Sequence, residues 1–276
     1  MCILFLFADP KSLINGYKLI LISNRDEFYA RPAKQAAPWE ENECVFGGRD
    51  MEPGREGGTW LALGFHDKII KVGALLNITG EARRINARGR GPIVADYVKG
   101  NTSNSNYSKK LLENDNFSSF NFVTVELDVL NDSATILHTS NVPNNTQKCE
   151  QSKALGFGNS PYTTPLEKVK AGTEKFQNII DNKENFKDKI TLIEKLLSLL
   201  QEREKHWPDN ELQKRAPNWG ENLSSIYVKM PEAGYGSRTR TVILVDENNK
   251  IDFIEETMNT FDPNEKWERI HLNHQL

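Results

Sequence analysis

Short apolar runs separated by polar turns fill the first part of the chain. Residues 2–7 and 17–23 form one pair, with Pro, Gly and Asn in the turn between them. Residues 59–64 and 69–77 form a second pair that turns at residues 66–68. Apolar runs of this length on either side of turn residues are typical of antiparallel hairpins. We therefore predict two hairpins here.

The middle of the chain has helical periodicity. Pro92 favours the first turn of a helix over residues 92–100, and the polar residues 101–108 predict a loop. Longer helices are predicted over residues 164–181 and 188–204. The second of these has a wide apolar stripe, made of Ile190, Ile193, Leu196, Leu197 and Leu200.

Strand patterns also occur further along the chain. Residues 121–128 and 134–139 alternate like a hairpin that turns at Asn131 and Asp132. Four more strands are predicted near the end, over residues 225–230, 241–246, 251–256 and 267–272. Because single strands and single helices do not alternate, the pattern predicts an α+β fold with antiparallel sheets. No repeat or long linker divides residues 1–276, so we predict one domain.

Composition and charge argue against several classes of protein. The 35 Lys and Arg side chains against 38 Asp and Glu give a net charge of −3, whereas general nucleic-acid binding needs a basic excess. The longest apolar run, residues 2–8, is far shorter than the roughly 20 residues of a membrane-spanning helix. It also lacks the basic start of a secretory signal, so we predict a cytoplasmic protein. Three dispersed cysteines and five dispersed histidines predict neither a disulfide framework nor a metal site.

The first candidate for chemistry is Cys2, which follows Met1 at the head of a predicted strand. If Met1 is removed, Cys2 carries both a thiol and a free α-amine, whose pKa is about 8. The amine can then take the proton of the thiol, as in N-terminal nucleophile catalysis. A cysteine that only packs against its neighbours is the alternative interpretation.

The second candidate is the charged sequence at residues 24–32, directly after the second predicted strand. On an extended chain the side chains of Arg25 and Glu27 share one face, and Asp26 takes the other. An arginine at this position can pair with a carboxylate or lower the pKa of a neighbouring thiol. An exposed turn with weak surface ion pairs is the alternative.

Arginines gather at two further places. One group precedes the helix predicted from residue 92 and comprises Arg83, Arg84, Arg88 and Arg90. It suits phosphates or carboxylates such as those of coenzyme A or haem, and a solvated loop is the alternative interpretation. A second pair, Arg238 and Arg240, stands where a strand pattern begins and can hold an anion or protect a sheet edge. The glycine-rich residues 52–60 lack the Lys-Ser/Thr end of a P-loop and predict a structural turn.

Taken together, these segments resemble one family. MCI at the start, LILISNRDEFYARP, REGGTWLALG, ARGRG, GFGN and GSRTRTVILVD occur in the order typical of the NRDE-motif family of transport and Golgi organisation proteins, and they span nearly the whole chain. The resemblance implies a four-layer αββα sandwich of two antiparallel sheets, related to N-terminal nucleophile hydrolases.

The resemblance also implies site residues. Those hydrolases use a nucleophilic Cys, an Arg, an Asp, two Asn and a late Arg, which match Cys2, Arg25, Asp26, Asn77, Asn159 and Arg238. Asp26 departs from the pattern, because the hydrolase Asp stands three residues after the Arg. The contacts implied for a bound ligand are Asn24, Arg25, Asp26, Glu27, Arg88, Arg90 and Arg238.

Three alternative functions follow from the family's links to secretion, lipid handling and haem movement. The first is a haem chaperone and acyl-CoA homeostasis factor that requires no cofactor. It binds a small amphipathic anion in a hydrolase-like pocket and works in the cytoplasm or at mitochondria, Golgi or endoplasmic reticulum. The second is an amidase or thioesterase with Cys2 as nucleophile. The third is a trafficking scaffold at the Golgi with a large apolar surface.

Overall fold

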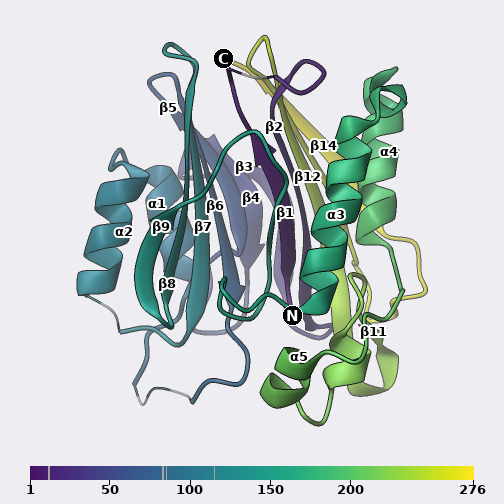
Figure 1. Cartoon of the computed structure of the whole chain (residues 1–276). Helices are drawn as coiled ribbons and strands as arrows, with labels where there is room; N and C mark the ends of the chain where they lie inside the picture. Colours follow the sequence, from purple (N-terminus) through teal and green to yellow (C-terminus); the bar gives the residue numbers. More distant parts are fainter. Residues whose placement is uncertain (12, 83, 85, 115) are drawn as a thin grey trace. The chain divides into compact units, whose positions relative to one another are not determined.

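The computed structural model describes residues 1–11, 13–82, 84, 86–114 and 116–276. The chain divides into two compact units: the first combines residues 1–30 with 152–276, and the second holds residues 31–151. Of the residues singled out above, Arg83 lies outside the described part of the chain. Each unit has its own antiparallel sheet and its own helices (Figure 1). The α+β class and the two antiparallel sheets are therefore confirmed, and the single domain stays a prediction.

The sheet of the first unit is built from the two ends of the chain. Its spatial order is β10 (Leu155–Phe157), β1 (Ile3–Ala8), β2 (Tyr17–Phe28), β12 (Tyr235–Asp246), β13 (Lys250–Thr257) and β14 (Glu268–Gln275), and β11 (Lys229–Met230) also pairs with β12. The predicted first hairpin is confirmed as β1 and β2. Strand β12 then pairs with β2 along almost its full length, so residues more than 200 positions apart become neighbours.

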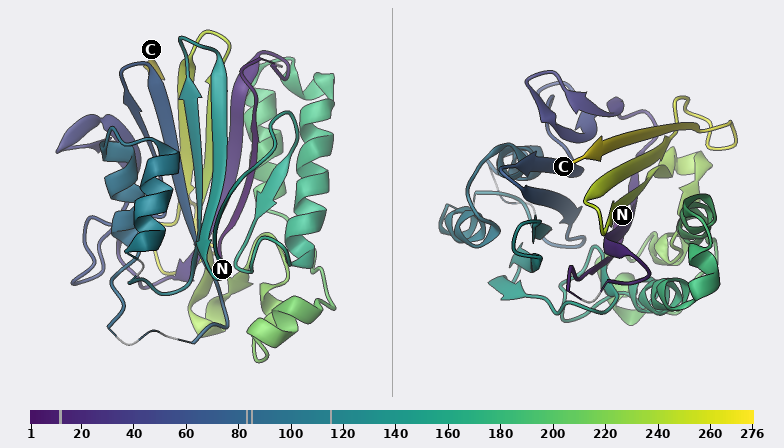
Figure 2. Two further views of the ribbon diagram at one scale, coloured as in Figure 1. Left: turned by 60° about the vertical axis from the view of Figure 1, so that its left-hand side comes forward. Right: turned by 90° about the horizontal axis from the view of Figure 1, so that it is seen from above.

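Helices cover one face of this sheet. The helical segments are α3 (Glu167–Asp181), α4 (Lys189–Leu200), α5 (Asn210–Arg215) and three short 3₁₀ turns at Lys183–Phe186, Gly220–Leu223 and Pro231–Ala233. Figure 2 shows α3 and α4 against the sheet from two further sides, and the stacked rings of Phe5 and Phe176 join β1 to α3. The predicted stripe of α4 is wrong at Ile190, which is 73% exposed. Six residues at about 100° each place Ile190 roughly 120° around the helix from Leu196.

The second unit is a meander whose strands follow one another in sequence order. The strands are β3 (Ala33–Trp39), β4 (Asn42–Asp50), β5 (Leu61–His66), β6 (Ile69–Asn77), β7 (Phe120–Asp128), β8 (Ser133–Asn141) and β9 (Asn144–Lys148). Helices α1 (Gly91–Lys99) and α2 (Asn104–Glu113) connect β6 to β7. Tyr97 of α1 packs edge-on against Phe122 of β7, with ring centres 5.6 Å apart. Both hairpins predicted in this part of the chain are confirmed.

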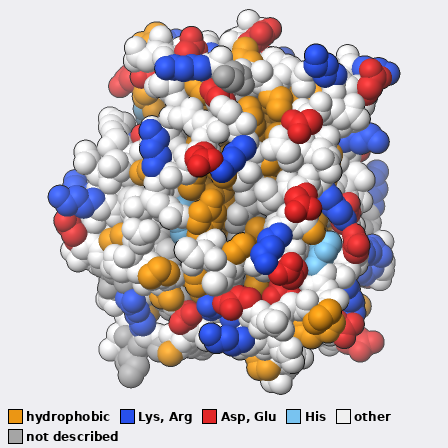
Figure 3. Space-filling model, viewed as in Figure 1, with side chains coloured by type: hydrophobic (Ala, Val, Ile, Leu, Met, Phe, Trp, Pro, Cys, Tyr) orange, Lys and Arg blue, Asp and Glu red, His pale blue; other side chains and the backbone are white. Residues whose placement is uncertain are grey.

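Two predictions of local structure are wrong. The loop expected over residues 101–108 contains the start of α2, because the Ser103 hydroxyl accepts a hydrogen bond from Asn106 N and caps the helix. The strand expected over residues 225–230 forms only at its last two residues. Residues 225–228 are irregular, because buried side chains bond to their backbone in place of a neighbouring strand. Across the face drawn in Figure 3, basic and acidic side chains are mixed, in line with the small net charge.

Candidate functional site

The ends of three strands bring the first candidates together in the first unit. Ile3 of β1 pairs with Asn24 of β2, so one step further along the chain Cys2 lies beside Arg25. On the other side of β2, Ser237 of β12 pairs with Asp26. Asn159 is buried two residues beyond the end of β10, the strand that pairs with β1. The register of the sheet therefore gathers the predicted residues of this unit at one end of the strands.

Asp26 is almost completely buried, and both of its carboxylate oxygens face other groups of the site. Its Oδ1 accepts a hydrogen bond of 2.5 Å from the Ser237 hydroxyl, whose oxygen in turn accepts one of 3.0 Å from Val228 N. Its Oδ2 lies 3.6 Å from the Met1 α-amine, which also donates to the Tyr235 hydroxyl. The carboxylate is thus fixed from one side by a hydroxyl and faces a cation on the other.

The Cys2 thiol is held in a neutral state. Its side chain is half-buried, and Sγ lies 4.0 Å from the carbonyl oxygen of Asp26. Burial raises the pKa of the Cys2 thiol above its ordinary value, and the charge of Asp26 adds to that rise, while the Met1 amine and Arg25 oppose it. With Met1 in place, the nitrogen of Cys2 belongs to a peptide bond and cannot serve as its base.

The two late arginines bind separate partners. Arg238 lies at an irregularity in the pairing of β12 with β2, and its Nη1 donates to the carbonyl oxygens of Phe28 at 2.9 Å and Tyr29 at 3.1 Å. Arg240 instead forms an ion pair of 2.7 Å with Glu256 and lies 4.2 Å from the Trp267 ring centre. Arg238 therefore fixes the chain directly after β2.

Two other predicted ligand contacts have local roles. The amide of Asn24 is fully buried and donates to the carbonyl oxygens of Leu200 at 2.8 Å and Ile226 at 3.0 Å. The Glu27 carboxylate is half-buried and accepts a hydrogen bond from Phe28 N. Asn24 holds the irregular segment of residues 225–228 in place, and Glu27 stabilises the end of β2.

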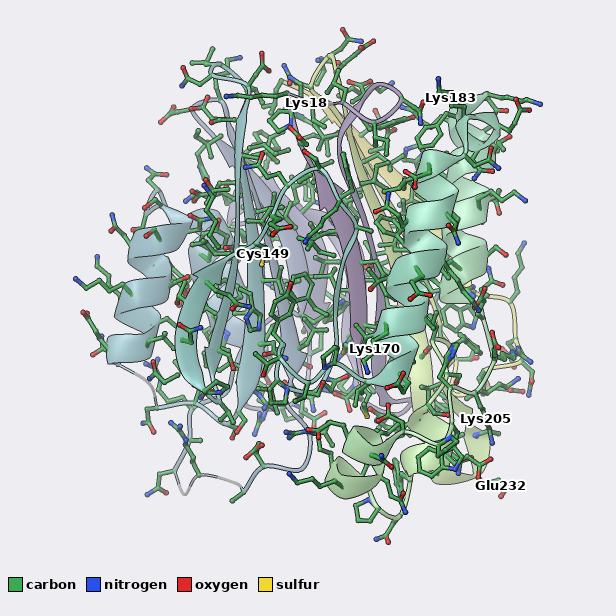
Figure 4. All side chains as sticks on the ribbon, viewed as in Figure 1. Lys18, Cys149, Lys170, Lys183, Lys205 and Glu232 are labelled. Atoms are coloured by element: carbon green, nitrogen blue, oxygen red, sulfur yellow. The ribbon has the colours of Figure 1, made fainter. Side chains whose placement is uncertain are left out.

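Sequence reasoning missed Lys168, Tyr235 and Ser237. Lys168 is fully buried, and its ammonium donates a 3.0 Å hydrogen bond to Ser225 O. By contrast Lys170, labelled in Figure 4 near the start of α3, is exposed and pairs with Glu167 at 2.6 Å. A signal for Lys168 was present, because it precedes Gly172, Phe176 and Ile180 at a spacing of four along the buried stripe of α3.

The remaining predicted residues belong to the second unit. Asn77 is the exposed last residue of β6. Arg88 is exposed, with its guanidinium 5.8 Å from the Phe117 ring centre, and Arg90 donates to Ser119 O at 2.9 Å just before α1. Their participation in one site with Cys2 stays a prediction.

The two glycine-rich motifs of the second unit pack on each other. A Cβ atom on Gly91 would lie 2.7 Å from the Cα atom of Gly58, so neither position has room for a side chain. Thr59 N also donates to Gly91 O at 3.3 Å. These contacts explain the REGG sequence as a structural turn against which the start of α1 packs.

Within the described residues, no group of three or more His, Cys, Asp or Glu side chains is arranged to hold a metal ion. In the same part of the chain, no helix is long and apolar enough to cross a membrane.

Comparison with known proteins gives the family. The family model described as Transport and Golgi organisation 2 matches residues 1–260. The chain belongs to this family. The Transport and Golgi organization protein 2 of Drosophila melanogaster is 47% identical over 277 residues, covering 99% of this chain and 97% of the relative. The human homologue is 33% identical over 264 residues, covering 94% and 93%. The bovine homologue is also 33% identical, covering 97% and 96%. The resemblance inferred from the motifs is thereby confirmed.

Proposed function

We propose that this protein binds an amphipathic anionic metabolite, acyl-CoA or haem, and that this binding serves the transport and Golgi organisation for which its relatives are named. The ligand lies at the end of β1 and β2, with Arg25 as its main contact. Arg238 and Asn24 shape the surrounding backbone. Arg88, which is exposed and belongs to the second unit, is a separate candidate contact for a phosphate or carboxylate.

One observation carries this proposal: the site holds a buried arginine next to a neutral thiol whose own backbone nitrogen is part of a peptide bond. Arg25 is only 5% exposed and stands at the position opposite Cys2. A guanidinium removed from water binds carboxylate and phosphate oxygens strongly and in a fixed orientation. Because the thiol is neutral and the nitrogen of Cys2 is in a peptide bond, this form of the site favours holding a ligand over attacking it.

Titration of the purified protein with palmitoyl-CoA and with haemin tests the proposal. We expect saturable binding of at least one of the two, and an affinity at least tenfold lower in Arg25→Met, because a buried charge-assisted contact is worth about 1.5–3 kcal/mol. Lys170→Met is the matched control, since it removes an exposed cation on the same unit. Absence of binding to either compound, or equal affinity in Arg25→Met and the control, would contradict the proposal.

A second candidate function is a thiol-dependent amidase or thioesterase. The observation that favours it is the position of Cys2 directly before β1, with its Sγ 4.0 Å from the carbonyl oxygen of the buried Asp26. Hydrolysis of the Met1–Cys2 peptide bond releases Met1 and frees a new α-amine on Cys2, which can accept the thiol proton before attack on a carbonyl carbon. Asn159, buried near Cys2, is the candidate to stabilise the resulting oxyanion.

Intact-mass measurement after reaction with an activated acyl probe tests this second function. We expect loss of the Met1 mass and one acyl adduct on Cys2 that is absent in Cys2→Ser. Cys44→Ser is the control, because Cys44 is also half-buried and lies in the second unit. A protein that retains Met1 completely in its native source would exclude this candidate and leave the binding proposal untouched.

A further inference from the structure

A cavity of about 250 Å³ lies at the β3–β4 hairpin of the second unit, and neither function proposed above uses it. Pockets that hold drug-sized ligands have volumes of about 300–1,000 Å³, so this volume fits a smaller molecule. The lining of this hairpin cavity combines apolar and charged side chains, chiefly Lys34, Pro38, Trp39, Glu40, Glu41 and Arg49. A small ligand with both an apolar part and a charge is therefore the kind of occupant to consider.

Arg49 is a cation of this cavity whose guanidinium is held in place by its neighbours. It lies 4.1 Å from the ring centre of Trp39, whose Nε1 donates to Gly47 O at 2.9 Å. A Cβ atom on Gly57 would lie 2.8 Å from Nη2 of Arg49, so a side chain there would displace the guanidinium. The φ of Gly57, 80°, also favours glycine. The indole ring and the glycine loop therefore fix the orientation of the guanidinium plane.

Part of the hydrogen-bonding capacity of Arg49 is unused. Its Nε has no acceptor within the described part of the chain, and its Nη1 donates to Glu41 at 2.7 Å. The Glu41 side chain is 47% exposed, and exposed ion pairs of this kind contribute little to stability. The guanidinium can therefore exchange Glu41 for the carboxylate of a ligand, which fits two of its donors at once.

The charges around the hairpin cavity balance one another. Lys34 of β3 is paired with Arg49 of β4, so the two cations share one face of the hairpin. Glu40 and Glu41 form the turn, and both glutamates and Lys34 are exposed. A simple anion would meet the two carboxylates, and a simple cation would meet the two basic groups. A ligand that carries both charges is complementary to both pairs.

We propose that the hairpin cavity binds a free amino acid with an apolar side chain. The carboxylate of the ligand takes the place of Glu41 at Arg49, with Lys34 as the second cation. Its ammonium group faces Glu40 and the released Glu41. Its side chain packs against the apolar wall, which includes Pro38. This binding does not depend on either function proposed above, because none of these residues belongs to the site at the end of β1 and β2.

Titration of the full-length protein with L-phenylalanine, followed by saturation-transfer NMR, tests this proposal. Two analogues separate the charges of the ligand: 3-phenylpropanoate lacks the ammonium group, and 2-phenylethylamine lacks the carboxylate. We expect saturable binding of L-phenylalanine and an affinity lower by about tenfold for each analogue, because each loses charge-assisted hydrogen bonds. Absence of saturable binding of L-phenylalanine, or an analogue that binds as tightly, would overturn the proposal.

Two variants test the residues that carry the site. Arg49→Met should weaken the binding of L-phenylalanine and 3-phenylpropanoate by about tenfold and leave that of 2-phenylethylamine unchanged. Glu41→Gln frees Arg49 from its partner, so it should strengthen the binding of 3-phenylpropanoate and weaken that of 2-phenylethylamine. A general loss of structure does not produce these opposite changes.

Lys109→Met, on an exposed side chain of α2, is the matched control and should bind all three compounds as the wild type does. Circular dichroism checks that each variant is folded. If Arg49→Met is folded and keeps the affinities of the control, Arg49 does not hold the ligand and the proposal fails. If Arg49→Met does not fold, Glu41→Gln decides alone, and unchanged affinities for both analogues in that variant overturn the proposal.

Discussion

Lys71 in the second unit and Lys168 in the first are both buried, but they differ in the number of hydrogen-bond acceptors around the ammonium group. Lys71 of β6 is 3% exposed, and its ammonium donates at 2.7 Å to the carbonyl oxygens of both Gly100 and Thr102. It also lies 3.7 Å from Oε1 of Glu126. Lys168 of α3 is equally buried but has only Ser225 O as a hydrogen-bond acceptor among the described residues. Burial lowers the pKa of both lysines.

The carboxylates near these lysines, Glu126 and Asp26, also differ in the hydrogen bonds that they accept. Burial raises the pKa of Glu126, while Lys71 opposes that rise. Oε1 of Glu126 accepts from Asn104 N at 2.7 Å and from the Tyr97 hydroxyl at 3.2 Å. These bonds join the end of α1 and the start of α2 to the sheet. In the first unit, Oδ2 of Asp26 faces the Met1 amine at 3.6 Å and accepts no hydrogen bond within the described part of the chain.

A buried network in which every hydrogen-bond donor and acceptor has a partner stabilises a fold. A buried network in which some donors or acceptors have no partner can respond to a ligand or to a change of charge. The network of Lys71 belongs to the first kind, because it holds two helices in place. The network of Asp26, Lys168 and the Met1 amine belongs to the second kind. This difference supports our proposal that the functional site lies in the first unit.

The largest loss of stability is expected from breaking the hydrogen-bond network of Lys71 and Glu126. Lys71→Met leaves Glu126 and two carbonyl oxygens without their donor, and loss of one partner of a buried pair costs about 3 kcal/mol. Urea unfolding measures this loss. Adding Glu126→Gln should recover part of it, because no uncompensated carboxylate then remains. Lys109→Met, on an exposed side chain of α2, is the control and should cost less than about 0.5 kcal/mol. An equal cost in Lys71→Met and Lys109→Met would show that the buried network of Lys71 stabilises the fold no more than an exposed ion pair does.

A pH-dependent change of stability of intermediate size is expected from His138, which forms a buried pair with Asn121 in the second unit. Its Nε2 lies 2.9 Å from Oδ1 of Asn121, and burial lowers the pKa of His138 from 6.5 to about 4. The folded protein thus keeps the imidazole neutral where the unfolded chain already takes up a proton. This stability contribution is complete above about pH 6.5 and is lost as the pH falls towards 4, amounting to about 2 kcal/mol between pH 7.5 and pH 5.

Urea unfolding at both pH values checks the His138 contribution. His138→Gln keeps a donor for Asn121 and should lose correspondingly less stability on acidification. His274→Gln, near the end of β14, is the control and should retain the wild-type decrease. An unchanged decrease in His138→Gln would show that the imidazole is not held neutral by the fold.

The sequence predicted the hairpins well, because apolar runs and turn residues lie close together in the chain. The extension of β2 through the charged residues 24–28 was not predicted, since charged side chains at a strand end resemble a turn. Their burial depends on β12, whose pairing with β2 joins distant parts of the chain. No local pattern announces such a pairing.

Some residues of the candidate site could likewise be predicted from local sequence, and others could not. Cys2 and Arg25 follow from the first hairpin, so their proximity was within reach of the sequence. Tyr235 and Ser237 were not, although Ser237 belongs to a motif that was noticed, because their partner Asp26 is more than 200 residues away. Lys168 was hidden for another reason. A lysine in line with the apolar residues of a helix looks like a break in the apolar stripe, unless a buried carboxylate near it is already known.

The smallest effect on stability is expected from Lys168 itself. Lys168→Met removes one hydrogen bond and the attraction to Asp26, but it also removes an ammonium group that is costly to bury, so the net cost should be about 1 kcal/mol. Urea unfolding of Lys168→Met beside Lys71→Met makes the comparison directly. The Met1 amine still faces Asp26 in the Lys168 variant, whereas Glu126 has no second cation in the Lys71 variant among the described residues. If both substitutions cost the same, the network of the first unit is as closed as that of the second, and its buried lysine is structural.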